Sequence, residues 1–286
     1  MHNAIHFNGA IGAATHANIP ALSPAVLYGK GVFTTIAVYD GTPFLWEKHW
    51  RRLTHDGKVL GIDLTERSEE SVRTALDEIV SSNSVSDGRA RITFFDESPS
   101  AVWPSDSEAA TSVLITTGDR RPVSKDFKVE ISQARVSSIS RTARIKSCNY
   151  LDNLLAYEEA ERQGFNEAIR LNERGEVTSG CMANVFWLEG EKLCTPSLMT
   201  GCLAGTTREF VLENLEVEEV NVGKERIEAS EALFLTSSGL GVARVSELSG
   251  RGSAARTIRY LALSRRTQPN PNTKTRTPET GIRVRP

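Results

Sequence analysis

The sequence has no C-x-x-C pair and no other cysteine spacing typical of a metal site, so we expect no bound metal. Its four cysteines are Cys148, Cys181, Cys194 and Cys202, and we expect them to be reduced thiols. No apolar run approaches the ~20 residues that a membrane-spanning helix requires, so no membrane association is expected. Residues 1–20 lack a basic stretch followed by an apolar one. We therefore expect no secretory signal peptide and a cytoplasmic protein.

An excess of charge of one sign is also absent. The 34 Lys and Arg residues nearly balance the 36 Asp and Glu residues, and the formal net charge is -2. This balance predicts neither nucleic acid nor an anionic membrane surface as a partner. The hydrophobic content of 39% and the charged content of 24% are ordinary for a globular protein. A chain of 286 residues accommodates one large domain or two modest ones.

The first part of the chain shows both strand and helix periodicities. Residues 32–39 alternate between two faces, which predicts a strand, and Asp40-Gly41 predicts the turn that follows it. From Trp46 the apolar period becomes helical. Further elements are expected as a helix at 69–80 with Ser68 as its N-cap and as a strand at 90–95, and residues 113–117 form another short apolar segment.

The second part predicts one helix among several strands. Residues 150–163 carry Leu151, Leu154 and Leu155 at helical spacing. Glu158 interrupts this leucine stripe, so we expect the second half of the helix to be more exposed than the first. Strands are expected at 127–131, 167–171, 185–188 and 232–236.

Strands and helices occur in separate stretches rather than in regular alternation, and this predicts an α+β fold. The polar segment 118–125 is expected to connect a small α+β domain at 1–120 with a larger β-rich domain at 121–266. The tail at 267–286 is polar, basic and rich in Pro and Thr. We expect this tail to be disordered.

The segment from Gly205 to Glu209 carries the clearest chemical signal in the residues themselves. Thr206, followed three residues later by Glu209, predicts a capping box at the start of a helix. A helix N-terminus preceded by glycine presents free N–H groups and the positive end of a dipole to a phosphate. The alternative is a well-capped helix that binds no ligand.

Other candidates each have two interpretations. Arg52 could make forked contacts with a phosphate, or it could lie on the surface beside an apolar stripe. His49 could be catalytic, or it could pack and hydrogen-bond beside the tryptophans. Lys146 could form a Schiff base if its amine were desolvated, or it could be an ordinary surface charge. Ser237 and Ser238 could bind an anion or form a turn.

Taken together and in order, six motifs make the chain resemble the class IV aminotransferase family, also called fold type IV pyridoxal-phosphate enzymes. The motifs are GKGVFTT at 29–35, HWRRL at 49–53, IKSCNYLDNLLAYEEA at 145–160, VTSGCMANVFW at 177–187, GTTRE at 205–209 and LTSSG at 235–239. The resemblance implies a two-domain architecture like that of D-amino-acid aminotransferases. It also implies bound pyridoxal 5′-phosphate, a small-molecule amino substrate and a homodimer.

The resemblance further implies roles for individual residues. Lys146 matches the Schiff-base lysine, which also carries protons between the substrate carbon and solvent. Arg52 matches the arginine that binds the cofactor phosphate. The other matches are Thr206 and Thr207 at the helix N-terminus around the phosphate, Ser237 or Ser238 in a third phosphate loop, and Thr34 and Thr35 on the strand that faces the substrate.

Two departures from the family pattern stand out. The family has a glutamate that keeps the cofactor's pyridine nitrogen protonated, and this chain has Ser179 at that cofactor-facing position. Glu176 does not replace the glutamate, because an offset of three along a strand points to the opposite face. Without a carboxylate, the ring is a weaker electron sink. The family commonly has Thr-Arg-Gly where this chain has TFF at 93–95, so that arginine's contact is lost unless Arg89 or Arg91 replaces it.

Within the family, the K-S-x-N spacing at Lys146 resembles D-amino-acid aminotransferases and 4-amino-4-deoxychorismate lyases. FTT at 33–35 and ANVFW at 183–187 look closest to the lyases, which form pyruvate and 4-aminobenzoate for folate synthesis. By analogy with unrelated enzymes, a hydroxyl residue at the ring nitrogen fits elimination better than transamination. The alternatives are a transaminase of branched-chain or D-amino acids and a degenerate protein that binds the cofactor without turnover.

Overall fold

The structure, a computed structural model, describes residues 1–99 and 110–252. The tail predicted at 267–286 therefore lies outside the described residues. Within these two ranges no helix is both long and apolar enough to span a bilayer. All four cysteines carry free thiols, as the sequence predicts.

An antiparallel sheet organises the first part of the chain. Its strands are β1 (Ala4–Phe7), β2 (Ala10–Ala13), β3 (Gly31–Tyr39), β4 (Thr42–Pro43), β5 (Gly88–Asp96) and β6 (Thr111–Asp119), in the order β2-β1-β6-β5-β3-β4. The turn between β3 and β4 uses Asp40 and Gly41, both with positive φ, as the Asp-Gly pair predicts. The predicted strands at 32–39 and 90–95 are thus confirmed, with small extensions at their ends, and the apolar segment 113–117 lies within β6.

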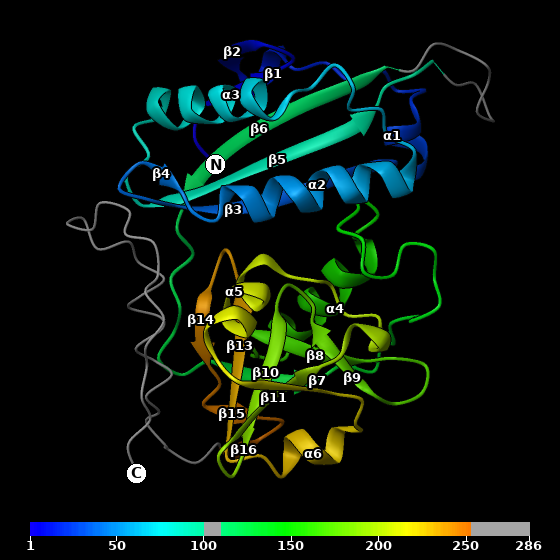
Figure 1. The fold of residues 1–286 in the computed structure, drawn as a ribbon, viewed down its shortest axis with the longest axis vertical. Coiled ribbons are helices and arrows are strands. Elements are labelled where there is room, and N and C mark those ends of the chain that lie inside the picture. The colour runs from blue at the N-terminus through cyan, green and yellow to red at the C-terminus, as the bar shows by residue number, and fades with distance from the viewer. Residues whose placement is uncertain (100–109, 253–286) are drawn as a thin grey trace.

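Two long helices cover one face of this sheet (Figure 1). Helix α2 (Trp46–Leu60) packs along β3, and α3 (Glu69–Ser82) packs along β1 and β6. The Ser68 side chain accepts a hydrogen bond from the backbone N–H of Ser71, so the predicted N-cap is confirmed. Apolar residues of both helices and of alternate β3 positions form one core, which includes Val32, Ile36, Leu53, Leu76 and Ile79. The short helix α1 (Pro24–Tyr28) precedes β3.

Two further sheets form the second part of the chain. One contains β7 (Lys128–Ile131), β8 (Glu167–Leu171), β9 (Val177–Gly180), β15 (Glu247–Leu248) and β16 (Arg251–Gly252), in the order β16-β15-β7-β8-β9. The other contains β10 (Asn184–Glu189), β11 (Lys192–Pro196), β12 (Val217–Val220), β13 (Ala232–Ser237) and β14 (Gly241–Arg244), in the order β12-β11-β10-β13-β14. The helices are α4 (Leu151–Arg162), α5 (Thr206–Asn214) and α6 (Lys224–Glu228).

These elements together form an α+β fold, as the sequence predicts. The first sheet uses residues 4–119, and the other two sheets use residues 128–252. The placement of a domain boundary between residues 120 and 121 stays a prediction.

The packing of α4 differs from the sequence-based expectation. Leu151, Leu154 and Leu155 are exposed on the isolated chain, at 59%, 42% and 51%. The buried residues of this helix are Ala156 and Ala160, and Ala160 lies in the half that we expected to be more exposed. Small alanines allow α4 to approach β8 closely, so the helix packs through them and its leucines face away.

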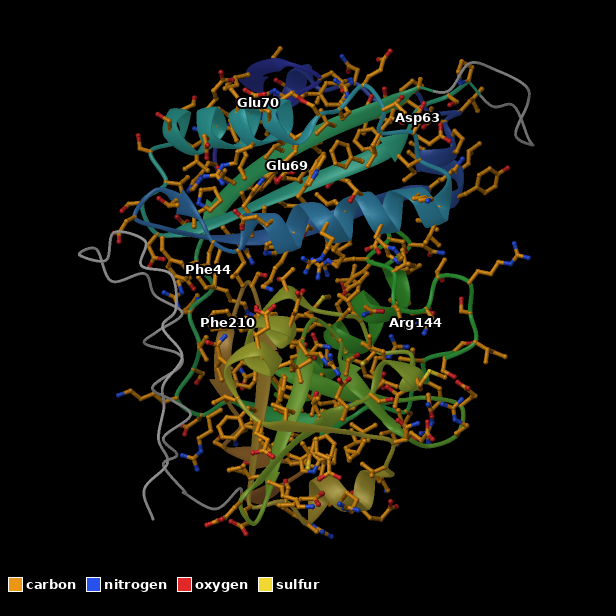
Figure 2. All side chains as sticks on the ribbon, in the orientation of Figure 1. Phe44, Asp63, Glu69, Glu70, Arg144 and Phe210 are labelled. Carbon is orange, nitrogen blue, oxygen red and sulfur yellow. The ribbon has the colours of Figure 1, made fainter. Side chains whose placement is uncertain are left out.

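The two parts of the chain meet where α2 lies over α5. Phe44 from the first part and Phe210 on α5 face each other across this junction, with ring centroids 5.9 Å apart (Figure 2). Beside them Lys48 forms an ion pair with Glu209 at 2.9 Å and another with Glu213, and Arg51 also pairs with Glu209. Aromatic contact and charge pairing thus join α2 to α5.

Replacing Leu76, which is fully buried on α3, should test the core of the first part. Leu76→Ala is expected to lower the free energy of unfolding by about 2–5 kcal/mol, because it removes buried methyl groups and leaves a cavity. Val59→Ala on α2, where the side chain is 49% exposed, is the control and should change it by less than about 0.5 kcal/mol. Urea unfolding followed by tryptophan fluorescence measures both, and equal effects would contradict this account of the core.

Candidate functional site

The backbone of Lys146 is fixed against β3 and α2. The Phe33 N–H donates to the Lys146 carbonyl at 2.9 Å, and the Cys148 N–H donates to the Gly31 carbonyl at 2.8 Å. The Lys146 N–H in turn donates to Oδ2 of Asp56 at 3.0 Å. A Cβ on Gly31 would lie 2.9 Å from the Cys148 sulfur, so only glycine permits this close approach. The lysine backbone is therefore held in place by two hydrogen bonds of its own and by a third from Cys148, all to other parts of the chain.

The Lys146 amine lies between two aromatic rings. Its Nζ is 4.4 Å from the centroid of Phe33 and 4.8 Å from that of Tyr150. No carboxylate of residues 1–99 or 110–252 forms an ion pair with it. Burial, followed by repulsion from Arg52 and Arg91, lowers the pKa of Lys146 to about 7. A substantial share of the amine is therefore neutral and nucleophilic near neutral pH.

Arg52 approaches the same place from α2. One terminal nitrogen donates to the Thr34 hydroxyl at 2.7 Å and the other to the Ala204 carbonyl at 3.4 Å. Its Nε is buried and has no hydrogen-bond partner among the described residues. An unsatisfied buried guanidinium N–H is costly, so this side chain is suited to an anion that would complete its bonds.

His49 links Arg52 to the start of α5. Its Nδ1 lies 2.6 Å from the Thr34 hydroxyl and its Nε2 lies 3.2 Å from the Thr206 hydroxyl. Burial, with Arg52 and Lys146 nearby, lowers the pKa of His49 well below its usual range, so the ring is neutral. The Thr34 hydroxyl accepts from Arg52 and lies against Nδ1, so Thr34 connects the imidazole to the guanidinium.

The start of α5 differs from the predicted capping box. The N-cap is Gly205, which has no side-chain cap, and Thr206 is already the first helical residue. The Thr206 hydroxyl faces His49 instead of the helix backbone, and the Glu209 carboxylate is drawn to the cations Lys48 and Arg51. The capping-box prediction was therefore wrong, although the helix does begin where it was expected.

This uncapped helix end favours the predicted anion site. The backbone N–H groups of Thr206, Thr207 and Arg208 have no acceptor among the described residues. A Cβ on Gly205 would lie 2.1 Å from Oδ1 of Asn184, so a side chain at this position would clash. Free N–H groups at the positive end of a helix dipole bind phosphate well.

The loop after β13 distinguishes between two neighbouring serines. The Ser238 hydroxyl lies 3.3 Å from the Thr206 hydroxyl and 3.5 Å from Nε2 of His49. The Ser237 hydroxyl instead accepts the Leu240 N–H at 3.2 Å and closes a turn. Of the two predicted alternatives, Ser238 is the one that faces the start of α5.

The two threonines of β3 point in opposite directions, as alternation along a strand requires. The Thr34 side chain is fully buried and hydrogen-bonded to Arg52 and His49. We therefore assign Thr34 to the positioning of Arg52 rather than to a substrate contact. Thr35 lies on the same face of the strand as Phe33, whose ring contacts Lys146, and it remains the predicted substrate contact.

Arg89 and Arg91 are the two candidates to replace the missing family arginine, and the structure places one of them near Lys146. The Arg91 guanidinium stacks 3.6 Å from the centroid of Phe33, the same ring that contacts the lysine amine. Arg89 pairs with Ala37 further along β3. Of the two, Arg91 is thus the arginine that lies beside the Lys146 amine.

Ser179 lies on β9 and is partly buried. Glu176 is engaged by Arg174 at 2.6 Å and by Asn172 at 2.7 Å, which keeps its carboxylate away from the face of Ser179. The expectation that Glu176 does not replace the family glutamate agrees with this arrangement.

Of three further residues that shape this site, sequence reasoning proposed only His49, as a catalytic or a packing residue, and selected neither Asp56 nor Tyr150. Asp56 holds the Lys146 backbone, Tyr150 contacts its amine, and His49 joins Arg52 to α5. The HWRRL and CNYLDN motifs contain His49 and Tyr150, so the motifs themselves carried a signal for both. No motif indicated a role for Asp56, because its hydrogen-bond partner Lys146 is 90 positions away in the chain.

Comparisons with known proteins agree on one family. The model of the amino-transferase class IV family matches residues 31–248. The chain is 32% identical over 252 residues to the aminodeoxychorismate lyase of Bacillus subtilis, covering 83% of this chain and 84% of that protein. It is 28% identical over 255 residues to a putative branched-chain-amino-acid aminotransferase of Methanocaldococcus jannaschii, with 86% and 88% covered. The solved branched-chain aminotransferase of Thermoproteus uzoniensis with norvaline superposes with a TM-score of 0.85 at 25% identity, covering 93% of this chain and 94% of that one.

The reaction of the cofactor-free protein with pyridoxal phosphate should depend on the protonation of Lys146. The rate is expected to rise with pH through a midpoint of about 7, because only the neutral amine attacks the aldehyde. Arg91→Gln should move this midpoint to higher pH, since it removes a positive charge that lowers the lysine pKa. Stopped-flow absorbance measures the rate. Arg89→Gln on the same strand is the control, Lys146→Ala should not react, and an unmoved midpoint in Arg91→Gln would contradict the argument.

Ser238 and Ser237 form a matched pair for testing the anion site. Ser238→Ala is expected to weaken the binding of pyridoxal phosphate about tenfold to a hundredfold, the effect of losing one hydrogen bond to a charged group. Ser237→Ala should leave the affinity within a few-fold of the wild type, because its hydroxyl closes a turn. Fluorescence titration gives both dissociation constants. A larger loss in Ser237→Ala would reverse the assignment.

Proposed function

We propose that this chain, which belongs to the class IV aminotransferase family of pyridoxal-phosphate-dependent enzymes, acts as a 4-amino-4-deoxychorismate lyase. The family membership and the cofactor follow from the match over residues 31–248. The choice of reaction is supported by the 32% identity with the Bacillus subtilis lyase over most of both chains. The proposed reaction releases pyruvate and leaves 4-aminobenzoate, a precursor in folate synthesis.

The residues at the site fit this cofactor. A phosphate group would satisfy the buried, unpartnered Nε of Arg52 and the free N–H groups of Thr206 and Thr207. The Ser238 hydroxyl would add a further donor. The neutral share of the Lys146 amine suits an aldehyde carbon. When bound, pyridoxal phosphate supplies an electron-withdrawing ring conjugated to the substrate's amino group.

In the proposed reaction, Lys146 transfers protons and Arg91 binds the substrate. Lys146 takes the proton from the ring carbon that bears the substrate's amino group, because its pKa of about 7 lets Nζ hold or release a proton near neutrality. The same Nζ can return a proton to the departing three-carbon group. Arg91, beside Phe33, is positioned to bind a substrate carboxylate.

The proposed reaction balances without a second substrate. One carbon–oxygen bond breaks between the ring and the enolpyruvyl group, and one proton moves from the ring carbon to the methylene carbon of that group. The products are an aromatic amine and pyruvate, and aromatisation drives the release. No keto acid is consumed, which separates this reaction from transamination.

Transamination of branched-chain or D-amino acids is the second candidate. The similarity to the Methanocaldococcus jannaschii and Thermoproteus uzoniensis proteins supports it. Transamination requires carbanion stabilisation twice in each cycle, and Ser179 provides no carboxylate to keep the ring protonated. We therefore place the lyase first.

A homodimer is also part of the proposal. Leu151, Leu154 and Leu155 on α4 are exposed on the isolated chain. Close to them Gly29 at the end of α1 contacts Asn149, and the preceding Val26, Leu27 and Tyr28 are exposed as well. An apolar surface of this kind is typical of a subunit interface. A second copy of the chain would cover it near Lys146.

The deciding experiment supplies 4-amino-4-deoxychorismate to the cofactor-loaded enzyme without any keto acid. Pyruvate and 4-aminobenzoate should appear in equal amounts, and Lys146→Ala should form neither. Lactate dehydrogenase coupling follows pyruvate, and fluorescence follows 4-aminobenzoate. Turnover that requires both an amino donor and a keto acid would reject the lyase in favour of the transaminase.

A further inference from the structure

Strand β9 ends between the two groups of residues that would hold the cofactor. The Cys181 carbonyl, just after the strand, accepts the Tyr150 hydroxyl at 3.2 Å and the Asn153 amide at 2.6 Å. Further along, Asn184 donates to a backbone carbonyl that precedes α5, at 2.8 Å. Ser179 therefore lies on a strand tied to the Lys146 side of the site through α4 and to the phosphate side through α5.

A buried arginine stands directly opposite Ser179 on the neighbouring strand. Arg170 on β8 pairs with Ser179 in the antiparallel register, so the two side chains leave the sheet on the same face. Arg170 is only 3% exposed. Its guanidinium donates to the carbonyls of Ala134 at 3.3 Å and Arg135 at 2.9 Å and to the Asn153 amide oxygen at 3.1 Å. All three acceptors are neutral.

No carboxylate of the described residues compensates the charge of Arg170 by an ion pair. Glu167 is the buried carboxylate on the same strand, but an offset of three residues directs its side chain to the other face. Its oxygens accept the backbone N–H groups of residues 168, 181 and 182. Burial raises the pKa of both Cys181 and Tyr150 to about 12, so neither carries a negative charge near neutral pH. Arg170 is thus the cation beside Ser179, and the Glu167 carboxylate lies past the end of β9, where it is held by backbone N–H groups.

We propose that Arg170 and Ser179 keep the ring nitrogen of the bound pyridoxal phosphate unprotonated. This inference rests on the proposed attachment at Lys146 and the phosphate site at α5. In pyridoxal phosphate the ring nitrogen is para to the carbon that carries the aldehyde, so attachment at Lys146 would direct this nitrogen away from the lysine and toward the end of β9. A serine hydroxyl donates a hydrogen bond to a neutral ring nitrogen, and a buried cation nearby disfavours a second positive charge.

An unprotonated ring withdraws fewer electrons from the substrate. Such a ring suits a reaction in which the substrate itself stabilises the developing charge. Loss of a leaving group with aromatisation is of this kind, whereas transamination depends on the ring. Arg170 is a positioning residue in this account, because it acts on the cofactor through its field and through Ser179.

Nitrogen NMR of the intact holoenzyme tests the proposal directly. Wild-type protein loaded with pyridoxal phosphate carrying ¹⁵N in the ring should give the chemical shift of a neutral pyridine across the pH range in which the fold is stable. Arg170→Gln should raise the pKa of the ring nitrogen by about 1 unit or more, because it removes the nearby charge. Arg170→Lys keeps the charge and should retain the wild-type shift. A purely structural arginine would alter the unfolding curve without changing the nitrogen signal.

The possible outcomes separate this inference from the proposed function. A pyridinium signal in the wild type, or equal signals in Arg170→Gln and Arg170→Lys, overturns it. If Arg170→Gln does not fold, Ser179→Glu adds a negative charge at the same place and should produce the same protonation. Failure to load the cofactor overturns the inference together with the proposed function. A neutral ring in an enzyme without lyase activity supports the inference and rejects the lyase.

Discussion

The site depends on the confinement of positive charge in a partly buried space. Lys146 and Arg52 lie near each other, Arg91 lies on the same aromatic ring as the lysine amine, and Asp56 is the carboxylate close to the first two. Desolvation and repulsion together lower the pKa of the lysine, which makes its amine a nucleophile. The same excess of positive charge leaves Arg52 with a buried donor that an anion would satisfy. A ligand with a phosphate ester and an aldehyde would bind the free donor of Arg52 and react with the amine of Lys146.

This charge arrangement exists only because the two parts of the chain are held together. Arg52 comes from α2, and the free N–H groups come from α5. His49 hydrogen-bonds to residues of both parts and stays neutral because it is buried. Phe44 against Phe210 and the ion pairs of Lys48 add an apolar contact and charge pairing at the same junction. The anion site is therefore an interface property, and neither helix would form it alone.

Local patterns were informative where a residue's neighbours in the chain decide its environment. The strands of the first sheet, the N-cap at Ser68 and the turn at Asp40-Gly41 follow from alternation, helix-end chemistry and turn preference. Local patterns were misleading where a residue distant in the chain competes for the same side chain. Glu209 was expected to cap α5, but its carboxylate pairs with the cations Lys48 and Arg51 of α2 instead. The leucines of α4 were expected inside, but the alanines pack more closely on β8.

The sequence by itself determined which chemical groups are present and in what order, and the six motifs carried the family and its cofactor. It also determined that Ser179 stands where the family has a glutamate. Only the tertiary structure decided that Ser238 rather than Ser237 faces α5, that Thr34 supports Arg52, and that Arg170 stands beside Ser179. These are relations between strands and helices distant in the chain. Periodicity indicates on which face of its own helix or strand a side chain lies. Strand register and helix packing determine which side chains of different elements come into contact.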